Sequence, residues 1–114
     1  MERSSFSTHL LDAAVRRRGE RLEAERRAVL EKVIQILRRE ASRLGIRRAY
    51  AVGSIASEGA WADESDVDVA IVGGDPLQVM KLLEEVTGRD VDVVELERHA
   101  APGIFLRRGI EIVG

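Results

Sequence analysis

The first part of the chain has the hydrophobic spacing of a long amphipathic helix. Between Thr8 and Leu44 there is no proline, and Gly19 is the only glycine. Glycine costs about 1 kcal/mol relative to alanine inside a helix, so we expect Gly19 to fray or bend the helix there. The residues before Gly19 then form either a separate short helix or a mobile arm, and Gly45 is placed to end the helix. The apolar positions that recur close to every 3.6 residues are Leu22, Val29, Val33, Ile36, Leu37 and Leu44.

The second half of the chain alternates between strand and helix patterns. The middle strand segment alternates and then becomes continuously apolar, as in a strand buried first on one side and then on both. A glycine pair follows it, and Asp75-Pro76 is a typical helix start. The spacing predicts strands over residues 47–52, 66–72 and 90–96, a helix over 77–86 that ends at Thr87-Gly88, and a short helix and last strand within 104–113.

These elements predict an α/β (α+β) fold with a small mixed β-sheet flanked by helices and a long N-terminal helix. We expect residues 1–45 to form an N-terminal helical region that packs on a core formed by residues 46–114. The length of 114 residues suits one domain. The apolar content of 45% is enough for a packed core and too high for a disordered chain.

Charge and composition exclude several classes of function. Charged residues make up 33% of the chain, but the formal net charge is only −2, which argues against a protein that binds nucleic acid mainly through phosphate attraction. The absence of cysteine excludes disulfides and thiolate metal sites. No apolar run approaches the roughly 18 residues that span a membrane, and the first residues lack the order of a signal peptide. We therefore expect a cytoplasmic protein.

A glycine and a serine follow the first predicted strand of the second half. Gly53-Ser54 stands where that strand gives way to a turn. Backbone N–H groups in such a turn can approach an anion closely, and a following helix start favours negative charge. For an isolated Gly-Ser pair, an ordinary tight turn is the more common explanation.

Two aspartates share one face of the next strand. Because side chains alternate along a strand, Asp66 and Asp68 point the same way, with Cα atoms roughly 6.5–7 Å apart. Val67 and Val69 then point into the core. Neighbouring like charges destabilise a strand, and a divalent cation such as Mg²⁺ or Mn²⁺ would compensate. A solvent-facing polar strand is the alternative interpretation.

The third strand repeats this arrangement with Asp90 and Asp92 on one face. If it lies beside the strand with Asp66 and Asp68, one of its carboxylates can join the other two. Three carboxylates around two metal ions about 3.5–4 Å apart are a known arrangement for in-line phosphoryl transfer.

The three motifs together resemble a known family. Gly53-Ser54, a loop of about a dozen residues, Ser65-Asp66-Val67-Asp68 and then Val91-Asp92-Val93-Val94 are similar to the DNA polymerase beta superfamily of nucleotidyltransferases. Within it the chain resembles the minimal nucleotidyltransferase (MNT) branch, over roughly Arg47 to the C-terminus. Each motif alone is common, and their combination on strand, turn and strand is fairly specific.

The resemblance implies roles for individual residues. The Gly53-Ser54 turn, the phosphate turn, would hold the triphosphate. Two aspartates would bind both Mg²⁺ ions, with Mn²⁺ as an alternative metal. A third carboxylate would help to deprotonate the acceptor hydroxyl. Asp90 is the rival for that third role. The residues assigned are Gly53, Ser54 and Ser65 for nucleotide binding and Asp66, Asp68 and Asp92 for metal binding and catalysis.

The resemblance also implies a reaction and partners. Family members move a nucleoside monophosphate, commonly AMP from ATP, to a hydroxyl group. MNT proteins are often paired with HEPN toxin proteins that they nucleotidylate and neutralise, so an antitoxin acting on a HEPN-like partner is expected. Neither nucleic acid nor a membrane is an expected partner. A small apolar patch that could bind a partner helix or a second copy in a homodimer comprises Leu10, Leu11, Ala14 and Val15.

One residue departs from the family pattern. The family has Gly-Ser-x-Ala-x-Gly, whereas here Glu58 precedes Gly59 and lengthens the loop by one residue. An insertion in a surface loop has a low thermodynamic cost, yet a shift of about 1 Å between reacting groups lowers catalysis strongly. The competing hypothesis is a binding module that kept the fold, lost the chemistry and neutralises or scaffolds a partner by surface contact.

Two further features have a structural and a functional interpretation. Trp61, between the turn and the aspartate strand, either stacks on a nucleobase or packs the loop, and packing is the more common role. Arginine pairs on the long helix, such as Arg26-Arg27, either contact RNA or form a salt-bridged solvent face with the intervening glutamates. The balanced charges favour the solvent face.

Overall fold

Helix α1 (Glu2–Leu44) is continuous in the computed structural model, which describes residues 2–114 and the side chains of all of these except 2–8, 104 and 105. The expected interruption at Gly19 was wrong. A Cβ at Gly19 would meet no atom within 4 Å, so the helix position is open and its cost is only the backbone freedom that glycine loses. The helix ends at Gly45, whose φ of +75° terminates it in the expected way.

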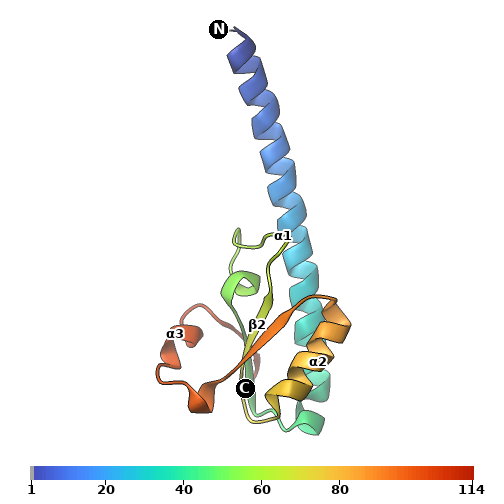
Figure 1. Cartoon of the computed structure of the whole chain (residues 1–114), viewed down its shortest axis with the longest axis vertical. Helices are drawn as coiled ribbons and strands as arrows, with labels where there is room; N and C mark the ends of the chain where they lie inside the picture. The colour runs from blue at the N-terminus through green and yellow to red at the C-terminus, as the bar shows by residue number, and fades with distance from the viewer. Residues whose placement is uncertain (1) are drawn as a thin grey trace.

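The two halves of α1 have different surroundings. Figure 1 shows the N-terminal half extending away from the rest of the molecule. The longest dimension of the whole molecule, with this half included, is 62 Å. Leu11 and Val15 on this projecting half are 64% and 69% exposed. The C-terminal half packs on the sheet and on α2 through its predicted apolar stripe, which buries Val29, Val33, Ile36, Leu37, Ala41 and Leu44.

Four strands form one mixed sheet in the order β3-β2-β1-β4. Strand β1 pairs antiparallel with β2 and β4, whereas β2 and β3 are parallel. Parallel neighbours need a crossover connection, and helix α2 (Pro76–Thr87) provides it. Asp75 caps α2 by accepting a hydrogen bond from the Leu77 N–H at 3.0 Å. The strands are β1 (Arg48–Val52), β2 (Val67–Val72), β3 (Val91–Glu95) and β4 (Ile110–Val113).

The two faces of the sheet are covered unequally. Helices α1 and α2 pack on one face, where the strand residues Val67, Val69 and Val91 join the main core. The opposite face holds only a small cluster formed by Val52, Ala70 and Leu96, near the short helices η2 (Leu96–Arg98) and α3 (Gly103–Leu106). That second face is therefore open for polar side chains.

The predicted fold class is confirmed: a mixed sheet flanked by helices, with a long N-terminal helix. Each predicted strand and helix of the second half is present, and strand β2 begins at Val67, so Asp66 precedes it. No helix among residues 2–114 combines the length and hydrophobicity that crossing a bilayer requires.

The continuity of α1 leads to a stability prediction. Gly19→Ala should raise the free energy of unfolding by about 0.5–1 kcal/mol, because alanine reduces the backbone freedom of the unfolded chain and fits the open position. Gly88→Ala is the matched control, because it is equally open but has a φ of +68°, so it should lower stability by about 1 kcal/mol or more. Urea unfolding measures both, and a destabilised Gly19→Ala variant would indicate a break in α1.

Candidate functional site

The open face of the sheet brings two of the predicted aspartates together. In the parallel register of β2 and β3, Asp68 lies directly opposite Asp92. Neighbouring strands are about 4.8 Å apart, and both side chains point to the same face because the valines next to them point into the core. Asp92 is exposed and Asp68 is half-buried. The structure thereby favours Asp92 over Asp90 as the partner of Asp68.

The glycine-serine turn lies against this aspartate pair. Val52 is opposite Asp68 in the register of β1 and β2, and the chain continues into the short helix η1 (Gly53–Ala56). Gly53 has a φ of +70°, and a Cβ built on it would lie 2.6 Å from the Asp68 Oδ2. Both the backbone conformation and the lack of space require glycine here. The backbone of the turn can therefore approach whatever Asp68 binds.

The turn and the aspartate pair open into a common cleft of about 890 Å³. Its lining includes valines and an alanine as well as two arginines that directly follow α3. A cleft with serine hydroxyls, carboxylates and guanidinium groups suits a ligand that carries both a metal ion and phosphate groups. The lining residues are Val52, Gly53, Ser54, Ser57, Ala60, Asp68, Asp92, Val93, Val94, Arg107 and Arg108.

Asp66 and Ser65 lie in a neighbouring depression of about 510 Å³, together with Asp90. The Ser65 hydroxyl accepts a hydrogen bond from the Ala62 N–H at 2.9 Å, so it supports the loop. Among the side chains that the structure describes, no three acidic or histidine groups are close enough to enclose a metal ion. Of the predicted site residues, the structure thus gathers Gly53, Ser54, Asp68 and Asp92 in the cleft and leaves Asp66 and Ser65 next to it.

The aspartate pair is electrostatically unfavourable by itself. Burial raises the pKa of the Asp68 carboxyl above its usual value, and the charges of Asp92 and Asp66 raise this pKa further. A divalent cation would remove that repulsion. Mg²⁺ is commonly held by one or two carboxylates, with substrate phosphates and water completing its coordination. Asp68 and Asp92 fit that pattern, and Asp66, two residues before Asp68, is close enough for its charge to act on Asp68.

Comparison with protein families decides the identity of this site. The model of the family "Polymerase beta, Nucleotidyltransferase" matches residues 31–111, which include the Gly53-Ser54 turn and the aspartates of β2 and β3. The chain belongs to the polymerase beta nucleotidyltransferase family. No curated protein matches the chain significantly.

Solved structures with the same fold include minimal nucleotidyltransferases and toxin-antitoxin complexes. A structure described as a minimal nucleotidyltransferase is 27% identical, with a TM-score of 0.54, and the match covers 81% of this chain and 93% of that one. A toxin-antitoxin structure with AMP-PNP is 23% identical with a TM-score of 0.58, covering 74% and 72%. The toxin-antitoxin MntA-HepT is 20% identical with a TM-score of 0.53, covering 77% and 72%. The chain thus shares its fold with structures described as minimal nucleotidyltransferases.

The extra residue of the loop, Glu58, does not line the cleft, although Ser57 and Ala60 on either side of it do. In this nucleotidyltransferase Glu58 is exposed within a tight turn, where the Ala60 N–H donates to the Ser57 carbonyl at 3.2 Å. Gly59 next to it has a φ of +80°. Val52 pairs with Asp68, so the turn and the acidic strand lie side by side with the added residue in the loop between them.

Trp61 packs the loop of the nucleotidyltransferase, as its more common role predicts. Its side chain is buried, and the guanidinium group of Arg89 lies 4.4 Å above the centre of its ring. It does not line the cleft. A nucleobase therefore cannot stack on it without unpacking the loop.

Three arginines near the site of this nucleotidyltransferase escaped the sequence interpretation. Arg107 and Arg108 form an inconspicuous pair between a turn and the last strand, and no spacing rule indicates that they line the cleft. The expectation of a solvent face was wrong for Arg26, which is buried and bonds to the site loop. Its position could have been found, because Leu22, Arg26 and Val29 follow the i, i+4, i+7 spacing of the buried stripe.

The raised pKa of Asp68 predicts a pH-dependent stability. A carboxyl whose folded-state pKa is raised stabilises the fold only while protonated, so its contribution is complete below the ordinary value near 3.8 and is lost as the pH rises through the raised pKa. In EDTA, Asp68→Asn should therefore have a higher Tm than the unchanged protein at pH 8, and the difference should shrink towards pH 4. Thermal unfolding followed by circular dichroism measures this, and a lower Tm for the variant at pH 8 would contradict it.

Proposed function

We propose that this nucleotidyltransferase uses Mg²⁺ to transfer AMP from ATP to a hydroxyl group of a partner protein, and that the partner is a HEPN-type toxin. The observation that carries the proposal is the shared cleft of the Gly53-Ser54 turn and the Asp68–Asp92 pair. Similar folds occur in the toxin-antitoxin MntA-HepT and in a toxin-antitoxin structure with AMP-PNP, which supports both the nucleotide and the partner class.

Each part of the cleft has a role in this reaction. The backbone of Gly53 and the hydroxyls of Ser54 and Ser57 bind the triphosphate. Asp68 and Asp92, with Asp66 beside them, would hold Mg²⁺ or Mn²⁺, and the bound ion would neutralise charge on the phosphates and lower the pKa of the acceptor hydroxyl. The acceptor oxygen bonds to the α-phosphorus, the bond to the β-phosphate oxygen breaks, and pyrophosphate leaves. Asp92, the more exposed carboxylate, is placed to receive the proton of the acceptor.

Arg107 and Arg108 give the cleft its positive charge. They are the cationic residues that line it, and they directly follow α3 in the chain. Guanidinium groups bind phosphate oxygens in a fork geometry that lysine cannot reproduce. Their role in this proposal is to bind the triphosphate and to stabilise the charge that develops on the leaving pyrophosphate.

The reaction is tested by incubating the protein with Mg²⁺, ATP labelled at the α-phosphate and the protein encoded beside it. We expect the label to appear on that partner. Asp92→Asn should reduce the transfer rate by about 100-fold or more, because it removes a metal ligand that faces Asp68. Asp90→Asn is the matched control and should stay within about threefold of the unchanged protein, since Asp90 lies outside the cleft.

Two results would contradict this proposal in different ways. Absence of label on the partner for the unchanged protein would contradict the transfer reaction itself. Equal losses of the transfer rate for Asp92→Asn and Asp90→Asn would leave the reaction intact but contradict the assignment of Asp92 alone as the third carboxylate.

The competing function is a binding module that neutralises its partner without chemistry. The observation that favours it is the projecting half of α1, where Leu10, Leu11 and Val15 are exposed although their spacing continues the apolar stripe. Such a surface fits a partner protein or a second copy of the chain in a homodimer.

The two functions differ in what Asp68→Asn does. Under the binding hypothesis, the variant binds the partner and neutralises it as well as the unchanged protein does. Under the transferase proposal, the variant still binds, because Asp68 is on the sheet and the projecting half of α1 extends away from it, but neutralisation is lost. Pull-down of the partner together with a growth assay in cells that express the toxin separates these outcomes.

A further inference from the structure

Helix α1 contacts the loop between the phosphate turn and the acidic strand through an ion pair between the buried Arg26 and the partly buried Glu23. Arg26 donates to both carboxylate oxygens of Glu23, through Nε at 2.9 Å and through Nη2 at 2.7 Å. Its remaining terminal nitrogen, Nη1, donates to the Ile55 carbonyl at 2.8 Å. Ile55 belongs to η1, directly after Gly53-Ser54. The ion pair therefore joins α1 to the turn that lines the cleft.

The same pair also holds the other side of the turn. Glu23 Oε1 accepts a hydrogen bond from the Gly59 N–H at 3.4 Å. Residues 55 and 59 are thus attached to one pair of side chains on α1, and the segment between them contains the extra residue Glu58. Arg26 is the only charged side chain that is buried among those that the structure describes, with 8% of its surface exposed.

The electrostatics of the pair keep it ionised. The hydrogen bond from Arg26 is the main cause that lowers the pKa of Glu23 to about 2, with the Gly59 N–H contributing, while burial opposes the shift. A buried charge without a partner is strongly destabilising, and so is a carbonyl that loses its donor. Any substitution at Arg26 that cannot replace all of its hydrogen bonds must therefore shift the turn or expose it to water.

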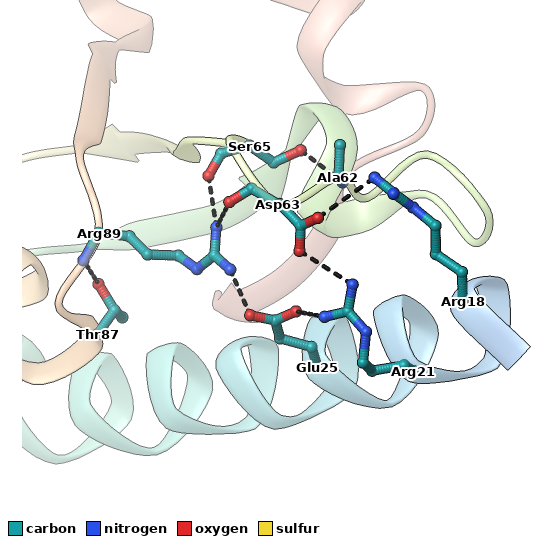
Figure 2. A network of polar contacts seen from close by, with 8 residues as sticks. All are labelled: Arg18, Arg21, Glu25, Ala62, Asp63, Ser65, Thr87 and Arg89. Atoms are coloured by element: carbon teal, nitrogen blue, oxygen red, sulfur yellow. Dashed lines mark hydrogen bonds and ion pairs between the residues drawn. The ribbon is translucent and has the colours of Figure 1, made fainter.

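A second arginine holds the opposite end of the same loop (Figure 2). Arg89 Nη1 donates to the carbonyls of Asp63 at 3.2 Å and Ser65 at 2.9 Å, directly before Asp66. Its Nη2 donates to Glu25 of α1 at 2.6 Å. Figure 2 also shows Arg18 and Arg21 of α1 bonded to the Asp63 carboxylate.

The two attachments act on different parts of the site. Arg26 contacts the segment that follows the phosphate turn, whereas Arg89 contacts the segment that leads into Asp66 and Asp68. Neither arginine lines the cleft, so neither touches a ligand bound there. Arg26 is itself a residue of α1, and Arg89 is bonded to Glu25, the residue before it on α1.

We propose that Arg26 and Arg89 are positioning residues with separable effects: Arg26 fixes the phosphate-binding turn, and Arg89 fixes the start of the metal-binding strand. The inference rests on the proposed function, because it presupposes that the cleft binds a nucleotide and Mg²⁺. It predicts that loss of Arg26 weakens nucleotide affinity, and that loss of Arg89 weakens the coupling of Mg²⁺ to the bound nucleotide.

The experiment is calorimetric titration of the full chain with AMP-PNP over a series of Mg²⁺ concentrations. Two quantities are extracted: the Kd of AMP-PNP at saturating Mg²⁺, and the Mg²⁺ concentration at which binding is half-enhanced. Arg26→Met should raise the Kd about tenfold or more and leave the Mg²⁺ midpoint within twofold. Arg89→Met should raise the Mg²⁺ midpoint at least threefold and change the Kd at saturating Mg²⁺ less than Arg26→Met does.

Further variants separate positioning from loss of folding. Arg26→Lys keeps the positive charge beside Glu23, so the variant should remain folded. Because lysine cannot form the forked contacts, the Kd of AMP-PNP should rise by an intermediate amount. Arg39→Met is the matched control on the same helix, since the exposed Arg39 contacts only Glu40, at 3.9 Å, among the ion pairs of the described residues, and both quantities should be unchanged. The Tm of each variant is measured in the same buffer, and the titrations are made at least 15 °C below the lowest Tm.

The outcomes are distinguishable. If the unchanged protein does not bind AMP-PNP, the proposed function fails. If the unchanged protein binds AMP-PNP and both Arg26→Met and Arg26→Lys bind it as tightly as the unchanged protein does, the positioning role of Arg26 is wrong. If the Arg26 and Arg89 variants change the Kd and the Mg²⁺ midpoint in the same ratio, the separate roles are wrong. In both cases the proposed function stands.

Discussion

The parallel register between β2 and β3 is the constraint on which the site depends. It sets Asp68 opposite Asp92 on the face of the sheet that the helices leave open. The alternation that directs these carboxylates outward directs Val67, Val69 and Val91 into the core, so a slip of one residue would bury the acids and expose the valines. The packing of the core therefore fixes the position of the charged groups.

Gly53 and helix α1 add the second half of the site. The lack of a side chain at Gly53 lets the turn lie against Asp68, and the ion pairs of α1 hold the loop that follows. The C-terminal half of α1 contributes core packing and its middle contributes polar attachments, while its N-terminal half extends beyond the domain. One helix thereby links the interior, the site loop and an exposed surface.

The sequence predicted the elements well because their signals are local. Alternation identified the strands, and Asp75-Pro76 and Gly88 marked the ends of α2 through capping and positive φ. The position of Asp92 opposite Asp68 follows from the strand register, whereas the sequence assigned Asp92 through the family resemblance alone, with Asp90 as the rival. The burial of Arg26 and the placement of Arg107 and Arg108 depend on contacts between segments far apart in the chain, so no local pattern revealed the last two. Gly19 misled because an intrinsic helix preference of about 1 kcal/mol is too small to break a long helix.

The central claim is that Asp68 and Asp92 hold a metal ion beside the Gly53-Ser54 turn. A crystal structure with Mn²⁺ and AMP-PNP tests it most directly, because the anomalous signal of manganese locates the ion independently of the nucleotide. The account predicts an anomalous peak at about 2.0–2.3 Å from oxygens of both Asp68 and Asp92, with the phosphates lying over the turn. Manganese bound instead between Asp63, Glu64 and Asp90, with neither Asp68 nor Asp92 as a ligand, would contradict the account.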